Sequence, residues 1–251
     1  MTLIRIALCL LALALPARAD ETALPAGYAL HKSIALDLAT NGIDGSLQIL
    51  EDDRITPALR AQMWQQTTDL DLVLAADDPL RKVLKKEPLR AAHLRLVDGA
   101  GKAVADRTLA VPLADIDRQQ LHEGGPSFLV SVDRSIGMGS YAGLETSLMQ
   151  VDHGLLAAEA LPGREALGRS LKNDWRIVDD TTPGPDGKPG TGKVIQVVAC
   201  HPNWANPKWA DQQEFVVELT TYRFAAGWQA QTKSAVGFWE SDQDWPDDQF
   251  P

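Results

Sequence analysis

The chain has 251 residues, and its 24 Lys and Arg residues against 34 Asp and Glu residues give a formal net charge of −10. A predicted leader, described next, contains two of the arginines and no acid, so the remaining 22 basic and 34 acidic residues give −12. Such a charge repels nucleic acid and anionic lipid headgroups, so the composition predicts no nucleic-acid partner.

Residues 1–19 have the pattern of a cleaved signal peptide. Arg5 precedes an apolar run of ten residues at 6–15, and Ala17-Arg18-Ala19 forms a small-x-small cleavage site before Asp20. The apolar run is too short for a membrane span, which needs about 20 residues. We therefore expect an exported protein, periplasmic or secreted, without a transmembrane segment.

Loss of the leader removes Cys9 and leaves Cys200 as the single cysteine of the mature chain. An intramolecular disulfide is thereby excluded. Cys200 ends an apolar run, which favours a buried and inert thiol. The adjacent His201 would point to the opposite face of a strand, which argues against a Cys/His pair.

The first half of the mature chain, residues 20–125, predicts a mixture of strands and short helices. Thr56-Pro57 and Asp78-Pro79 each give a helix N-cap followed by proline at the first helical position. Residues 114–122 are also predicted to be helical. Strands are expected at residues 33–38, 46–50, 69–75, 93–97 and 102–111, the last two joined by an Asp98–Gly101 hairpin turn.

Gly124-Gly125-Pro126 marks the candidate boundary of the second half, residues 126–251. The two halves either form separate domains or share one core. Here strands are expected at residues 128–132, 146–151, 155–160, 193–200, 214–224 and 228–239, with a helix at 164–172. Two long, β-branched runs, 193–200 and 214–224, predict a hairpin at the centre of a sheet.

Together these elements predict an α+β protein dominated by antiparallel β-sheet. Its short helices are expected mainly in the N-terminal half, and the C-terminal half is expected to form a β-sandwich or a strongly curved sheet. Hairpin connections and alternating strands argue against a parallel, doubly wound sheet.

No complete catalytic or cofactor motif occurs in the sequence. Ser140 is flanked by Gly139 and Gly143, but a nucleophile elbow needs glycine two residues to either side. The five histidines lack the close spacing of zinc ligands, and neither a P-loop nor a dinucleotide-binding pattern is present. We predict no metal, no cofactor and no catalytic residue from motifs.

The segment 179–193 holds three prolines and four glycines and is predicted to be a loop. Its Asp residues could supply oxygen ligands to calcium, but the spacing does not match an EF-hand. The same residue types are recruited by any exposed turn, so calcium binding and a plain loop both stay open.

The aromatic residues give the strongest indication of a binding surface. Trp204 and Trp209 lie in a loop rich in Asn and Pro, and Tyr141 lies in a glycine-rich segment. A rigid aromatic ring on a polar loop supplies a large contact area at low entropic cost. We name Trp204, Trp209 and Tyr141 as binding candidates; the alternative is that both indoles fold back over the sheet edge.

Three functions remain open from the sequence. The first is an exported, non-enzymatic binding or interaction protein of a bacterial-type envelope, with a protein or glycan partner. The second is a periplasmic or secreted hydrolase whose catalytic carboxylates are dispersed, drawn from Asp133, Glu145 or Asp152 beside Ser140. The third is a structural envelope protein without a ligand.

Overall fold

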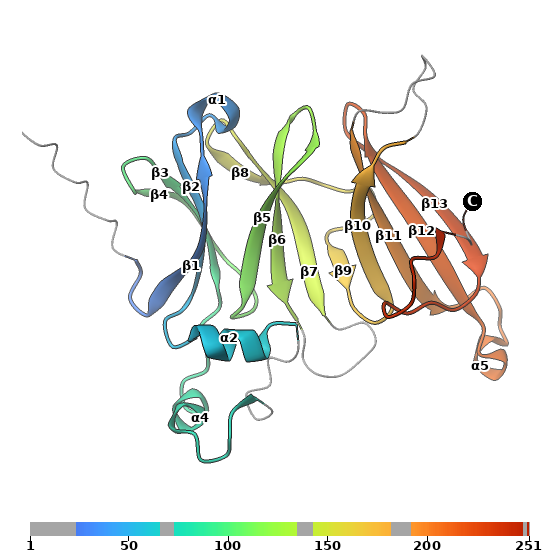
Figure 1. The fold of residues 1–251 in the computed structure, drawn as a ribbon, viewed down its shortest axis with the longest axis horizontal. Coiled ribbons are helices and arrows are strands. Elements are labelled where there is room, and N and C mark those ends of the chain that lie inside the picture. The colour runs from blue at the N-terminus through green and yellow to red at the C-terminus, as the bar shows by residue number, and fades with distance from the viewer. Residues whose placement is uncertain (1–23, 66–72, 135–142, 182–191, 248–249, 251) are drawn as a thin grey trace, which may run out of the picture.

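A computed structural model describes residues 24–65, 73–134, 143–181, 192–247 and 250. The described strands form three antiparallel sheets, called here the N-terminal, central and C-terminal sheets, with a few short helices (Figure 1). The predicted dominance of antiparallel β-sheet is confirmed. None of the sheets that these residues form is closed or curled.

The N-terminal sheet is a meander of four strands in chain order, β1 (Tyr28–Leu36), β2 (Gly45–Asp52), β3 (His93–Asp98) and β4 (Ala103–Thr108). The β3–β4 hairpin turns at the predicted position, where Gly101 adopts φ of 80°. In β1 the register shifts between Leu30 and Lys32, so His31 is an extra, unpaired residue. Strand β1 therefore carries a β-bulge.

The described helices are α1 (Leu38–Asn41), α2 (Pro57–Met63), α4 (Pro79–Leu84) and α5 (Trp209–Gln212). The two helix starts predicted from the Thr-Pro and Asp-Pro pairs are confirmed. The Thr56 side chain accepts from the Leu59 N–H, and the Asp78 side chain accepts from the Leu80 N–H. The strand predicted at residues 69–75 falls mainly outside the described residues.

The central sheet contains β5 (Ala114–His122), β6 (Gly125–Asp133), β7 (Leu144–Asp152) and β8 (Leu155–Ala158), and β9 (Leu167–Arg169) pairs with β7. The helices predicted at 114–122 and 164–172 are therefore wrong. β5 is an edge strand whose middle is exposed, so its Asp117–Gln120 stretch is polar without being helical. The turn at residue 125 joins two paired strands of this sheet.

The C-terminal sheet orders β10 (Asn173–Asp179), β11 (Lys193–Pro202), β12 (Phe215–Phe224) and β13 (Trp228–Val236) as neighbours. The predicted strands at 193–200 and 214–224 are confirmed as β11 and β12, the central pair of this sheet. Their ladder runs from Val194 opposite Arg223 to Pro202 opposite Phe215.

The central sheet is buried on both of its faces, between the two other sheets (Figure 1). Phe128 and Val130 pack against Leu47 and Ile49 of the N-terminal sheet. Leu129, which points the opposite way along the same strand, belongs to the cluster with the C-terminal sheet. This two-sided burial explains why β6 is apolar at consecutive positions.

The chain after β13 returns across the outer face of the C-terminal sheet. Trp239 is only 2% exposed and packs with Val198, Cys200 and Val217. The Trp239 N–H donates to Cys200 Sγ at 3.4 Å. The C-terminal segment thereby covers part of a face that would otherwise expose apolar side chains, and Cys200 is buried as expected.

Candidate functional site

The loop between β11 and β12 presents a tryptophan to solvent. Trp204 is 65% exposed, whereas Trp209 is half-buried at the start of α5. The two rings meet edge to face, with centroids 4.7 Å apart and planes inclined by 73°. The sequence named both as binding candidates, and the structure brings them into contact while Trp204 stays exposed.

Polar side chains fix the shape of this loop. The Glu214 carboxylate accepts hydrogen bonds from the side-chain amides of Asn203 and Asn206. The Asn206 Oδ1 atom in turn accepts from the Lys208 N–H at 2.9 Å. The loop on both sides of Trp204 is therefore fixed, and the Trp204 ring rests against Trp209. A side chain held in this way loses little further freedom on contact with a partner.

Trp204 lies at one end of the C-terminal sheet, which we call the tryptophan end. At this end of the C-terminal sheet β10 and β12 begin and β11 and β13 finish, because neighbouring strands run antiparallel. It carries four of the ten exposed large hydrophobic side chains among the described residues: Leu171, Trp204, Val236 and Phe238. Such clustering marks a contact surface more often than scattered exposure does.

A buried cation anchors one side of the tryptophan end. Lys172 Nζ lies 3.4 Å from the centroid of the Phe238 ring and 2.7 Å from Glu240 Oε1. Phe238 also meets Phe215 edge to face at 5.2 Å. The exposed phenyl ring is thus fixed by the side chains beneath it, as the indole is fixed by its loop.

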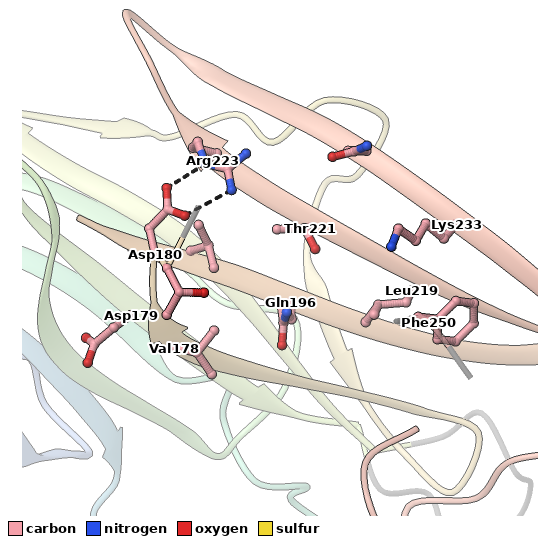
Figure 2. Close-up of a pocket in the computed structure, with 12 residues that line it drawn as sticks. Val178, Asp179, Asp180, Gln196, Leu219, Thr221, Arg223, Lys233 and Phe250 are labelled. Carbon is pink, nitrogen blue, oxygen red and sulfur yellow. Dashed lines mark hydrogen bonds and ion pairs between the residues drawn. The ribbon is translucent and has the colours of Figure 1, made fainter. Parts of the chain in front are cut away.

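A concavity of about 210 Å³ lies on the outer face of the C-terminal sheet (Figure 2). Gln196, Thr221 and Gln231 occupy one rung across β11, β12 and β13, and Phe250 stands at one side. Arg223 donates from Nε and Nη2 to Asp180, at 2.5 and 3.0 Å. This bidentate contact raises the pKa of Arg223. We call this concavity the polar pocket.

The three carboxylates named for a hydrolase differ in their surroundings. Asp133 is buried and accepts from the Gln65 N–H at 2.7 Å, while Glu145 pairs with Arg134. Asp152 lies at the opposite end of β7 from Glu145, roughly 24 Å away at the usual rise per residue. Ser140 and Tyr141 lie outside the described residues, as does most of the 179–193 loop.

His122, Glu159 and Ser127 do meet, in an order that does not match a catalytic triad. The Glu159 carboxylate stands in the middle and accepts from both His122 Nε2 and Ser127 Oγ, each at 2.7 Å. In a nucleophilic triad the histidine must contact the serine to remove its proton. Within the described part of the chain, no group of three His, Cys, Asp or Glu side chains is placed to hold a metal ion.

Sequence reasoning missed a third cluster, formed by His31, Glu51 and Arg60 beside a larger cavity. The three residues lie on β1, β2 and α2, with no local motif to link them. Glu51 was the one detectable signal, since it follows Leu47 and Ile49 on the buried face of a strand.

The chain matches no protein-family model, no curated protein and no solved structure. Among the described helices none is long and apolar enough to cross a membrane.

Proposed function

We propose that the chain is an exported, non-enzymatic binding protein that contacts a protein partner through the tryptophan end. The observation that carries this proposal is the exposure of Trp204, at 65%, on a loop fixed by hydrogen bonds. The predicted leader supports export. We take the C-terminal half as a β-sandwich of the central and C-terminal sheets, which gives the loop a rigid frame.

The chemistry of this surface favours a protein partner over a glycan. The other exposed large hydrophobic residues at this end are Val236, Phe238 and Leu171, whose side chains offer apolar contact but no hydrogen bonds. The amides of Asn203 and Asn206 are already engaged with Glu214. A partner that buries aliphatic and aromatic groups in its centre and carries basic groups at its rim would complement the apolar patch and the acidic chain.

The test is recovery of partners from the native envelope fraction by immobilised protein comprising residues 20–251. We expect Trp204→Ala and Val236→Ser each to abolish recovery of a protein retained by the wild type. Leu155→Ser is the matched control, because Leu155 is 71% exposed on β8 of the central sheet. Equal recovery with all four proteins would contradict the proposal.

A glycan at the polar pocket is a second candidate, and it rests on a separate observation. Among the described residues the Thr221 hydroxyl and the Gln231 amide hydrogen-bond to no other side chain, and Phe250, which Figure 2 shows next to Leu219, adds an apolar ring to the same pocket. Sugar rings combine an apolar face with hydroxyl groups that such side chains can bind. We expect Thr221→Val to weaken capture on a glycan array and Trp204→Ala to leave it unchanged.

A further inference from the structure

We propose that a cavity between β1, the end of β2 and α2 binds a small carboxylate with an apolar body. Arg60 and His31 meet the carboxylate, and the apolar lining surrounds the rest of the molecule. This inference goes beyond the proposed function, because the cavity lies on the N-terminal sheet and the tryptophan end lies on the C-terminal sheet.

The cavity has the size and lining of a small-molecule site. Its volume is about 500 Å³, within the ~300–1,000 Å³ typical of ligand pockets. Most of its wall is apolar and comes from Ala29, Leu30, Ile55, Pro57 and Ala61. A few polar groups converge on this wall, as ligand recognition requires.

His31 reaches the cavity because of the β-bulge. Leu30 pairs with Leu50 and Lys32 with Ile49, so His31 is the unpaired residue between them. A bulge redirects the side chain of the extra residue. The ring nitrogens of His31 make no hydrogen bond within the described part of the chain, and the nearest acid, Glu51 Oε2, is 3.9 Å from Nδ1. The imidazole is therefore available to a ligand.

Arg60 is fixed in place, but some of its N–H groups have no acceptor among the described residues. Its Nε atom donates to both Glu51 oxygens at 3.1 and 3.2 Å, and Nη2 donates to the Ala114 carbonyl at 2.9 Å. The guanidinium also lies 4.5 Å from the centroid of the Trp64 ring. Nη1 has no acceptor among the described residues. A guanidinium held on three sides is pre-organised to donate its remaining N–H groups to a carboxylate.

Both carboxylates that line the cavity are paired with arginines, although the whole chain is acidic. Glu51 is paired with Arg60, and Asp52 is paired with Arg54 and Arg90, which do not themselves line the cavity. The N–H groups of Arg60 that Glu51 and Ala114 leave unused can therefore donate to an anion.

The affinity for a carboxylate should depend on pH through the protonation of His31. Burial lowers the pKa of His31, and Arg60 and Lys32 lower it further, while Asp115 on β5 opposes them. Glu51 on β2 is the other titratable group that faces it. A carboxylate bound between Arg60 and His31 would stabilise the protonated imidazole and raise its pKa.

Calorimetric titration with hexanoate, octanoate and decanoate, below their micelle concentrations, tests the ligand class. We expect each added methylene to tighten binding by about fourfold while the chain still enters the cavity. Octan-1-ol lacks the carboxylate and octylamine reverses the charge, so both should bind at least tenfold more weakly than octanoate. Equal or tighter binding of either compound would overturn the proposal.

Two variants on the same helix locate the site. Ala61→Trp places an indole in the cavity and should abolish octanoate binding. Ala58→Trp is the matched control, since Ala58 is exposed on α2 and does not line the cavity, and it should bind as the wild type does. Unchanged binding by Ala61→Trp would show that the cavity is not the site.

NMR of the His31 ring gives a readout independent of affinity. Saturation with octanoate should raise the pKa of His31, and His31→Gln should remove the pH dependence of octanoate affinity between about pH 5.5 and 7.5. If the His31 resonances titrate identically with and without octanoate, the assignment of His31 is wrong.

Discussion

His122 Nε2 lies 2.7 Å from Glu159 Oε1, and this contact lies within the central sheet, since His122 ends β5 and Glu159 follows β8. His122 Nδ1 accepts from the Gly124 N–H, so the ring proton is on Nε2 and points at the carboxylate. From the C-terminal sheet, Trp228 Nε1 donates to the same oxygen, and the Phe224 ring stacks on the imidazole at 3.7 Å. Glu159 therefore accepts hydrogen bonds from two sheets.

Glu159→Gln should destabilise the protein by about 2–3 kcal/mol, because an amide NH₂ would face donors inside a buried network. The free energy of unfolding in urea measures this. Glu145→Gln is the control, since Glu145 is 46% exposed and pairs only with Arg134, and its effect should stay within about 0.5 kcal/mol. Equal effects of the two substitutions would mean that the network contributes little.

Truncation to alanine should cost much more stability at Trp239 than at Trp204. Trp239→Ala removes a ring that is 2% exposed and should cost about 3–5 kcal/mol of stability. Trp204→Ala should cost less than about 1 kcal/mol, because the ring is already in water. Thermal unfolding of both variants distinguishes them. A large loss of stability with Trp204→Ala would make Trp204 a structural residue.

The Asp52 carboxylate should stabilise the protein more at a pH above its ordinary pKa of 3.8 than at a pH below it. Burial alone would raise the pKa of Asp52, but hydrogen bonds from Arg54 and from the Arg90 N–H lower it to about 2, against an ordinary value of 3.8. The folded state therefore favours the ionised carboxylate. Its contribution, about 2 kcal/mol, is complete above the unfolded pKa and is lost as pH falls through the folded pKa.

Urea unfolding of Asp52→Asn across pH measures this contribution. The difference from wild type should be about 2 kcal/mol near pH 6 and should shrink steadily below about pH 4. Asp53→Asn is the control, because Asp53 is 52% exposed and its nearest cation, Arg90 Nη1, is 3.9 Å away. A difference that stays constant with pH would show that the native pKa of Asp52 is not depressed.

Cys200 should resist thiol reagents until the protein unfolds. The side chain is fully buried beneath Trp239, so a reagent cannot reach it in the native state. A chain comprising residues 20–251 should show no labelling in buffer and one labelled thiol in denaturant. In Trp239→Ala the thiol should label in native buffer, and rapid labelling of the wild type would contradict the packing.

The sequence predicted long strands well and one edge strand badly. Residues 193–200 and 214–224 are apolar and β-branched, and they form the centre of a sheet because only that position buries such runs. β5 is different, since its middle is polar and its strand character comes from pairing with β6. Local propensity favoured a helix there, and tertiary contact overrode it.

One candidate site could be predicted from the sequence and another could not. Trp204 could be found because a large aromatic in a polar loop is a local signal. His31, Glu51 and Arg60 are 20 and nine positions apart and meet only after β1, β2 and α2 have packed. The bulge that redirects His31 is a feature of register, which a single strand does not encode.

The two-sided burial of the central sheet has a consequence for how the chain acquires its shape during synthesis. The N-terminal sheet is made first, and its inner residues, Leu47 and Ile49 among them, have no cover until β5–β7 have followed. The other apolar face of the central sheet stays uncovered until β11 and β12 have been made. A nascent chain stalled between residues 110 and 140 would therefore expose the apolar inner face of the N-terminal sheet. It would depend on chaperones more than the completed molecule does.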